Sequence, residues 1–256
     1  GIPVLFEAVV TGTRGVERVT HALVAPYVAG ELGADEPIAC DTLLVSGGWN
    51  PAVHLFSQAR GRLRYDESLG AFLPGEALDG LTVTGSAAGV LDLAGCLADG
   101  QRAVRAALTA LDIAPAADEL PAAPAPAEEA APLVLWRVPD TSGGRTQFVD
   151  LQRDATVADI ARAVGAGLRS VEHVKRYTTI GTAHDQGKTS GVIASGIVAE
   201  LLGVPIRDTG TTTFRPPYTP VAFAALAGRD RGRLFDPERV TALHEWHVAA
   251  GAVFED

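Results

Sequence analysis

The sequence predicts an α/β fold divided into separate units, and three features of the chain indicate it. In the first 112 residues, short runs of β-branched and aromatic residues alternate with glycine turns. Apolar residues at helical spacing begin near Leu91 and return after Thr156. Between these parts, residues 113–132 are rich in Pro, Ala and Glu and hold nothing that could form a core. We therefore expect two folded units joined by a linker, followed by an extended segment and the beginning of a third unit at FDPERVTALHEWHVAAGAVFED.

The first unit is expected to alternate strands and turns before it ends in a helix. IPVLFEAVV is predicted as a strand, TGTRG as its turn and VERVTHALVAPY as the next strand. DTLLVSGGW is typical of a short, buried parallel strand that runs into a glycine turn, and GLTVTGSAAGV repeats this pattern. LDLAGCLADGQRAVRAALTAL then has helical spacing. A strand, a glycine turn and a helix bring backbone N–H groups to a helix N-terminus, where a phosphate is favourable.

The second unit is expected to be mainly helical. Thr156 with Asp159 three residues on predicts a capped helix over TVADIARAVGAG, and Ser170 is expected to cap SVEHVKRYTTIG. A third helix is expected from Ser190 to Leu202, ended by Gly203. LVLWRVP and TQFVDLQ are expected to be extended, as is TTTFRPPYTPVAF, because its prolines forbid a helix.

Composition excludes several classes of protein. The net charge of −10 disfavours a nucleic-acid partner and an anionic membrane surface, since both need a basic face. No apolar run approaches the ~20 residues of a transmembrane helix, and no signal peptide is recognisable. Cys40 and Cys96 are scattered, which favours free thiols and a cytoplasmic location. Because the chain has no methionine and both ends lie inside structural patterns, we interpret it as a piece of a longer polypeptide.

The stretch GTAHDQGKTSG nearly matches a phosphate-binding loop. Gly181 and Gly187 are separated by five residues instead of four before Lys188 and Thr189, and VKRYTTI precedes them in place of an apolar strand. The P-loop interpretation is therefore disfavoured.

Two stretches of the first unit resemble flavoproteins with two dinucleotide-binding domains. CDTLLVSGGWNP is similar to the motif that closes a chain crossover beside the dinucleotide, and VTGSAAGVLDLAGCLADGQRAV to the motif A-x-G-D with its helix. Ser86 stands where those flavoproteins have Asp, so the resemblance implies a dinucleotide other than FAD. The GxGxxG half of such a domain is absent from this chain.

The second unit resembles the [2Fe–2S] domain of bacterioferritin-associated ferredoxins, through RSVEHVKRYTTIGTAHDQGKTSG. On that resemblance, the four cysteine positions fall on Asp150, Gln152, Asp185 and Ser190. Thiolates hold such a cluster, so this copy is expected to contain no iron–sulfur cluster.

Together, FVDLQRDATVADIARAVGAGLRSVEHVKRYTTIGTAHDQGKTS, TTTFRPPYTPV and RVTALHEWHVAAGAVFED resemble the α-subunits of heterotetrameric sarcosine oxidases. The last of these segments resembles the opening of the glycine-cleavage T-protein, an aminomethyltransferase. The resemblance implies the following division of the chain: the distal half of a Rossmann-like dinucleotide domain (1–112), a linker (113–133), a cluster-free ferredoxin-like domain (134–203), an extended linker (204–230) and the start of a folate-binding domain (231–256).

This resemblance implies oxidative demethylation of sarcosine, a small-molecule substrate, to glycine and hydrogen peroxide. The methyl carbon leaves as formaldehyde or is captured by tetrahydrofolate. The resemblance implies FAD on a β-subunit, FMN at the interface of the α- and β-subunits, NAD on the α-subunit, and further γ- and δ-subunits as partners. This part of the chain is expected to be inactive alone, with no catalytic residue of its own.

The candidate cofactor residues follow from position. Val10, at a strand end, and residues of two glycine turns face one crevice in such a fold, so we expect NAD at Val10, Gly48, Ser86, Leu91 and Leu93. Lys175, Arg176 and Lys188 are candidates for contact with the FMN phosphate or with a carboxylate of a partner.

Other interpretations stay open. His244 and His247 have a spacing that can hold a metal, but no third ligand lies near them in the sequence. His173 and His184 fit a solvated face as well as a flavin or subunit interface. The alternatives to a sarcosine oxidase are a subunit of an opine or hydroxyproline dehydrogenase, and an assembly module without catalysis.

Overall fold

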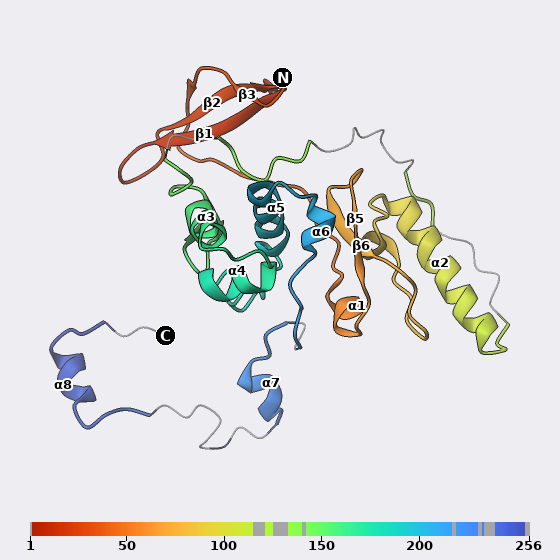
Figure 1. Ribbon diagram of the computed structural model, residues 1–256. Helices are drawn as coiled ribbons and strands as arrows, with labels where there is room; N and C mark the ends of the chain where they lie inside the picture. Colours follow the sequence, from red (N-terminus) through yellow and green to blue (C-terminus); the bar gives the residue numbers. More distant parts are fainter. Residues whose placement is uncertain are drawn as a thin grey trace. The chain divides into compact units, whose positions relative to one another are not determined.

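The computed structural model describes residues 2–114, 121–124, 133–139, 142–216, 219–229, 232 and 239–253. It divides into two units, Gly1–Tyr218 and Thr219–Asp256, and each is described by itself (Figure 1). Most of the Pro/Ala-rich linker predicted from the sequence lies outside the described residues. Helices and strands both occur, which confirms the mixed α/β class.

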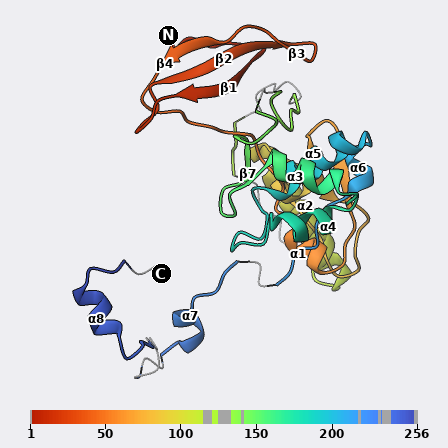
Figure 2. The same ribbon diagram turned by 60° about the vertical axis from the view of Figure 1, so that its left-hand side comes forward.

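The chain opens with an antiparallel sheet built around its second strand. β2 pairs with β1 along one edge and with β4 and then β3 along the other (Figure 2). The strands are β1 (Ala8–Arg14), β2 (His21–Val28), β3 (Glu31–Leu32) and β4 (Glu36–Ala39). Ala25 and Ala22 are its buried residues.

Two predictions for this region, one of a turn and one of a strand, are wrong. The segment TGTR is not a turn: it continues β1, which pairs through Arg14 with His21, and the chain turns only after Gly15. The expected buried parallel strand at residues 41–49 is also missing, and Leu44 and Val45 are 89% and 84% exposed. A buried parallel strand needs neighbours on both sides. Among the described residues, every paired strand is antiparallel.

A short hairpin follows the first sheet. It consists of β5 (Leu63–Asp66) and β6 (Ala71–Pro74), and α1 (His54–Gln58) precedes it. Asp66 holds the turn, because its Oδ1 accepts hydrogen bonds from the backbone and hydroxyl of Ser68 at 3.1 and 2.5 Å. These bonds, with one from Arg64, lower the pKa of Asp66 to about 2. Phe72 and Leu73 are buried on β6.

The long helix predicted near the end of the first part is confirmed. A 3₁₀ turn, η1 (Gly85–Ala88), leads into α2 (Leu93–Ala110). Asp92 caps α2, its Oδ1 accepting the backbone N–H of Gly95 at 2.7 Å. No residue of α2 is buried.

The helices predicted for the second part are confirmed as well. Thr156 precedes α3, and Asp159 Oδ2 accepts hydrogen bonds from its backbone N–H and its hydroxyl, both at 2.9 Å. Ser170 precedes α4, but its side chain makes no capping bond. Gly203, with φ of 65°, ends α5 as expected. The elements are β7 (Phe148–Asp150), β8 (Ala155–Thr156), α3 (Val157–Gly165), α4 (Val171–Thr178), α5 (Gly191–Leu202) and α6 (Ile206–Thr209).

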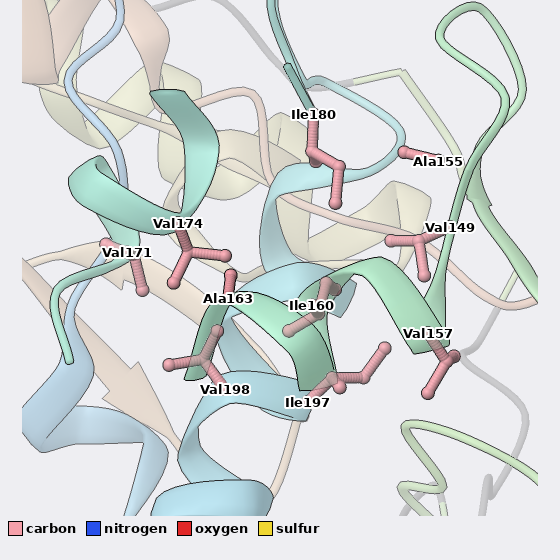
Figure 3. Packing of buried hydrophobic residues seen from close by; sticks show 10 residues of the cluster. All are labelled: Val149, Ala155, Val157, Ile160, Ala163, Val171, Val174, Ile180, Ile197 and Val198. Atoms are coloured by element: carbon pink, nitrogen blue, oxygen red, sulfur yellow. The ribbon is translucent and has the colours of Figure 1, made fainter. Parts of the chain in front are cut away.

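These elements enclose one apolar core. Ile160 of α3 and Ile197 of α5 are fully buried, and Val174 of α4 is 2% exposed. Figure 3 shows them among the other members of the cluster, which are Val149, Ala155, Val157, Ala163, Val171, Ile180 and Val198. Burial of this apolar surface is the main favourable term that holds α3, α4 and α5 together.

A second cluster joins the hairpin to α5 and α6. Phe72 of β6 packs with Ala199 and Ile206, both buried. Trp136 lies in LVLWRVP, the segment predicted to be extended, and contacts both clusters. Its ring is so close to Gly196 that a Cβ added to this glycine would lie 2.1 Å from the ring. Residues 133–139 form no strand. Their position is held by this ring and by two hydrogen bonds between Val138 and the side chain of Gln147, and not by strand pairing.

In the unit Thr219–Asp256, the described residues form two short helices, α7 (Phe223–Ala227) and α8 (His244–Ala249). Neither contains a buried residue. In the segment predicted as extended, 211–223, no helix occurs up to Pro216, but Phe223 begins α7. The region predicted as an extended linker, 204–230, therefore includes both α6 and α7.

Candidate functional site

The near-P-loop sequence forms a closed loop between α4 and α5, which we call the 181–190 loop. Gly181 and Gly187 both have positive φ, 71° and 77°. Their backbones touch: a Cβ added to Gly181 would lie 3.2 Å from the Cα of Gly187. Only glycine combines this conformation with such a close approach. The two glycines therefore close the loop on itself.

Backbone amides of this loop point to carboxylates of the chain. The N–H of Gly181 donates to Asp150 Oδ2 at 2.7 Å, and those of Gly187 and Thr189 donate to Asp185 at 3.0 and 3.3 Å. A P-loop directs such amides at a phosphate. Here the positions are taken by carboxylate oxygens, which gives a physical reason against the P-loop interpretation.

The four residues that stand at the cysteine positions of the ferredoxin template come together in this structure. Ser190 donates its hydroxyl to Asp150 Oδ2 at 3.2 Å, and the backbone N–H of Gln152 donates to Asp150 Oδ1 at 2.9 Å. Gln152 Oε1 accepts the backbone N–H of Asp185 at 3.5 Å. Hydrogen bonds therefore connect all four positions, although none of the side chains is a thiol.

Hydrogen bonding also sets the charge state of Asp185. Burial alone raises the pKa of this carboxyl, but hydrogen bonds from Thr189 and Gly187 outweigh that effect and hold the pKa below its usual value. His184 next to it contributes in the same direction and lies 3.3 Å from the side chain of Gln152. Asp185 is therefore ionised at neutral pH and anchors its own loop.

Of the three basic residues proposed to contact FMN, Lys188 lies in this loop and Lys175 and Arg176 lie on α4 just before it. Lys175 on α4 lines a small pocket, and the half-buried Lys188 donates a hydrogen bond from its Nζ to the carbonyl of Asp185 in the same loop at 3.4 Å. Arg176 is exposed and lies 3.9 Å from Glu172 one turn earlier on α4. Lys175 and Lys188 are the only two lysines of a chain that has 21 Lys and Arg residues in total. The structure places Lys188 in the 181–190 loop and Lys175 beside it.

The pocket beside Lys175 is mostly apolar. Its volume is about 10 Å³, about enough for one water molecule. Its walls come from α4, both ends of the 181–190 loop, α5 and the segment after α6: Val171, Val174, Ile180, Gly181, Gly191, Ala194, Ser195, Val198 and Thr212. The pocket is too small to enclose an organic ligand, so Lys175 lies beside an apolar surface and not in a ligand cavity.

A buried histidine that sequence reasoning missed lies near Lys188. His54 is 7% exposed, and its ring centroid is 4.0 Å from that of Phe214. Burial lowers its pKa, and the positive charge of Lys188 lowers it further. A lone histidine in the sequence carries no signal for such a position, because its neighbours come from distant segments.

The residues predicted to bind NAD lie on several elements. Val10 is in β1 and is 41% exposed, whereas Gly48 has φ of 93° in a segment without regular structure. Ser86 lies in η1, and Leu91 and Leu93, at the start of α2, are 51% and 58% exposed. The last three therefore share one surface segment.

The N-terminus of α2 does not suit a phosphate as the sequence suggested. Asp92 occupies it as the cap, bonded to the N–H of Gly95. The N–H of Gly85 likewise donates to Asp99 Oδ2 at 2.8 Å. Two carboxylates therefore accept the hydrogen bonds of backbone amides that a phosphate would need. Their negative charge would also repel a phosphate.

The described residues hold no group of three or more side chains able to bind a metal ion. His244 and His247 lie at the two ends of one turn of α8, where the His247 ring packs against Trp246 with centroids 5.0 Å apart. His173 is exposed on α4. Within the described part of the chain, no helix has the length and apolar character needed to span a membrane.

Comparison with known proteins identifies the relatives of this chain. Residues 144–229 match the family model of the sarcosine oxidase A3 domain. All of the chain aligns with sarcosine oxidase subunit alpha of Corynebacterium sp. (strain P-1), 48% identical over 265 residues, and 97% of it aligns with the same subunit of Rhizobium meliloti (strain 1021), 40% identical over 250 residues. The chain resembles this subunit throughout its length. The family resemblance stated from the sequence is confirmed.

The chain spans about a quarter of the length of these relatives, 27% and 24%. The solved structure of L-proline dehydrogenase from P. horikoshii is similar, with a TM-score of 0.61 and 18% sequence identity. The match covers 85% of this chain and 44% of the dehydrogenase chain. At this identity the match describes the fold alone. It shows that the sarcosine oxidase-like chain has a fold found in another protein.

Proposed function

We propose that this chain is part of the α-subunit of a heterotetrameric sarcosine oxidase, an oxidoreductase acting on a secondary amine with oxygen as acceptor. The observation that supports this most is the 48% identity to a sarcosine oxidase alpha subunit across the whole chain. The products would be glycine, hydrogen peroxide, and formaldehyde or 5,10-methylenetetrahydrofolate. Its partners would be the β-, γ- and δ-subunits, and its location the cytoplasm.

The proposed division of the chain follows the family resemblance. Residues 1–112 would complete a dinucleotide-binding domain, 134–203 would be the cluster-free ferredoxin-like domain and 231–256 would begin a folate-binding domain. The absence of thiols at the four connected positions around Asp150 supports a ferredoxin-like domain that needs no cluster.

The basic residues fit a flavin phosphate. FMN bound at the boundary with the β-subunit would supply the redox chemistry, and FAD would lie on that partner. Lys175, Arg176 and Lys188 would provide positive charge for the phosphate, in a chain whose overall charge of −10 would otherwise repel it. The apolar wall beside Lys175 would exclude water from that contact.

The proposed NAD residues fit the apolar part of a dinucleotide better than its phosphates. Leu91 and Leu93 present exposed side chains that would pack on a base or nicotinamide ring. Gly48 has open space where a side chain would be, so its backbone can approach a ligand. Val10 and Ser86 would complete the contact. Asp92 between the two leucines keeps phosphate away from this end of α2.

Sarcosine-dependent oxygen uptake by the full-length subunit, purified with its partners, tests the activity. Uptake with release of peroxide is expected, and tetrahydrofolate should reduce the free formaldehyde. A flavin-loaded complex that consumes no oxygen with sarcosine would refute the substrate, and hydroxyproline and opines would be assayed next. A complex without flavin at its interface would instead indicate an assembly module.

NAD binding is tested separately by releasing the dinucleotide from the denatured complex and measuring its content per α-subunit. Leu91→Glu should lower the content, because the new charge adds to Asp92 beside the ligand. Leu111→Glu, at the other end of α2 and also exposed to solvent, is the matched control and should retain NAD. Equal content in both variants would remove Leu91 from the site.

A further inference from the structure

The buried carboxylate of Asp150 joins both ends of the 181–190 loop to the turn after β7. It is 3% exposed. Its Oδ1 accepts the backbone N–H groups of Gln152 and Arg153 at 2.9 and 3.1 Å. Its Oδ2 accepts the N–H of Gly181 at 2.7 Å and the hydroxyl of Ser190 at 3.2 Å. One oxygen therefore holds the residues at which the loop begins and ends.

The donor set specifies a carboxylate. Three of the four groups around Asp150 are backbone N–H groups, which can only donate, and an ionised carboxylate can only accept. An asparagine of the same shape would turn its NH₂ group toward at least one N–H donor. The site is therefore built for a negative charge at this position and not merely for a polar side chain of this size.

The other bonds between the turn and the loop are made by exposed side chains. Arg153 donates to the hydroxyl and carbonyl of Thr182 at 3.0 and 3.1 Å, and Gln152 accepts from Asp185 at 3.5 Å. Both side chains are open to solvent. Exposed polar contacts contribute less than buried, charge-assisted ones. Asp150 is thus the main anchor of the loop.

The loop carries one basic residue of the proposed interface and borders another. Lys188 lies within it, two residues before Ser190, and Lys175 lines a pocket whose wall includes Gly181 and Gly191, at the two ends of the loop. We infer that Asp150 is a positioning residue: by closing the 181–190 loop it fixes Lys188, and the pocket wall below Lys175, for contact with the anionic group of the flavin-bearing partner. This inference rests on the interface proposed above.

Backbone hydrogen exchange in the full α-subunit with its partners tests the anchor directly. Asp150→Asn should speed exchange of the amides of residues 181–190 at least tenfold, and Ser190→Ala, which removes a single bond, should speed it less. Asp154→Asn is the matched control, since Asp154 is exposed in the same turn, and it should leave the loop unchanged. Unchanged exchange in both Asp150→Asn and Ser190→Ala overturns the inference.

A double-substitution cycle separates positioning from a merely structural role. Flavin content and the visible flavin spectrum would be measured for Asp150→Asn, Lys188→Gln and the two combined. If Asp150 acts through Lys188, the combined variant should lose no more flavin than Lys188→Gln alone. Additive losses overturn positioning through Lys188. A third outcome separates the two proposals. If Asp150→Asn speeds exchange in the loop but Lys188→Gln keeps its normal flavin content, Asp150 anchors the loop but the proposed interface at Lys188 is refuted.

Discussion

At the scale of single residues, carboxylates in this chain mainly bind backbone amides. Asp66 holds a hairpin turn, Asp92 caps α2, and Asp150 and Asp185 hold the 181–190 loop. Asp159 does the same for α3, and hydrogen bonds from Thr156 lower its pKa, with Arg162 adding to the effect. Each of these acids favours one local backbone conformation over the others.

Removing the α3 cap should have a measurable, pH-dependent effect. Asp159→Ala is expected to lower the free energy of unfolding by about 1 kcal/mol at neutral pH. Since the folded pKa is lowered, this contribution is present above the unfolded pKa of about 3.9 and is lost as the pH falls through the folded value. Denaturant titrations of both proteins at pH 7 and near pH 3 check this. A difference of equal size at both pH values would contradict it.

His54 is expected to make stability pH-dependent in a higher range. Its folded pKa is lowered by burial and by Lys188, so below about pH 6.5 the unfolded chain takes up a proton that the folded chain resists. Stability should therefore fall as the pH drops from about 6.5 toward the folded pKa. His54→Phe, which keeps a ring against Phe214, should flatten this part of the profile. Thermal melts from pH 8 to 5 would show an unaltered slope if His54 were not responsible.

At the scale of elements, glycines have contrasting roles that their local sequence does not reveal. Gly181 closes a loop with positive φ and a backbone contact, and Gly196 makes room for the ring of Trp136 on α5. A Cβ added to Gly100, inside α2, would meet no atom within 4 Å, and the φ of Gly100 is not positive. The first two are required by packing, and the third only weakens a helix.

Alanine substitutions at Gly181 and Gly100 should change the free energy of unfolding in opposite directions. Gly181→Ala is expected to destabilise the chain by about 1–2 kcal/mol, because alanine resists the left-handed conformation and would press on Gly187. Gly100→Ala should stabilise it by about 0.5–1 kcal/mol, since alanine favours the helix. Chemical denaturation of both variants beside the parent chain measures this pair. A stabilising effect of both substitutions would show that the loop tolerates a side chain at position 181.

At the scale of the whole molecule, the hairpin and the helical core belong to one packed unit although the sequence puts the predicted linker between them. Phe72 lies more than 120 residues before Ala199 and Ile206 in the chain and packs against both. Trp136 contacts this cluster and the main core. The stability of α5 and α6 should therefore depend on β6.

Phe72→Ala should test this dependence. It is expected to lower the free energy of unfolding by about 3–5 kcal/mol and to speed amide exchange in α5. Phe223→Ala is the matched control, because Phe223 is 79% exposed in α7. Hydrogen exchange resolved by segment distinguishes the two. Protection of α5 that survives Phe72→Ala would mean that the hairpin and the helical core fold separately.

The sequence by itself determined the four longer helices, α2, α3, α4 and α5, whereas the short helices α1, α6 and α7 were not predicted. Thr156 with Asp159, the apolar spacing of α2 and α3, and Gly203 after α5 are local signals, because a helix is built from contacts within four residues. The family resemblance was also within reach of sequence, since it depends on residue order alone. The extent of β1 and the exposure of residues 41–49 were not, because a strand forms only against a partner.

Only the tertiary structure decided what surrounds the 181–190 loop. The sequence marked Asp150, Gln152, Asp185 and Ser190 through a resemblance, but their mutual hydrogen bonds depend on how the chain returns 40 residues later. The burial of His54 against Phe214 and of Trp136 over Gly196 is decided in the same way. Burial and hydrogen bonding between distant segments follow from packing, which the local sequence pattern does not encode.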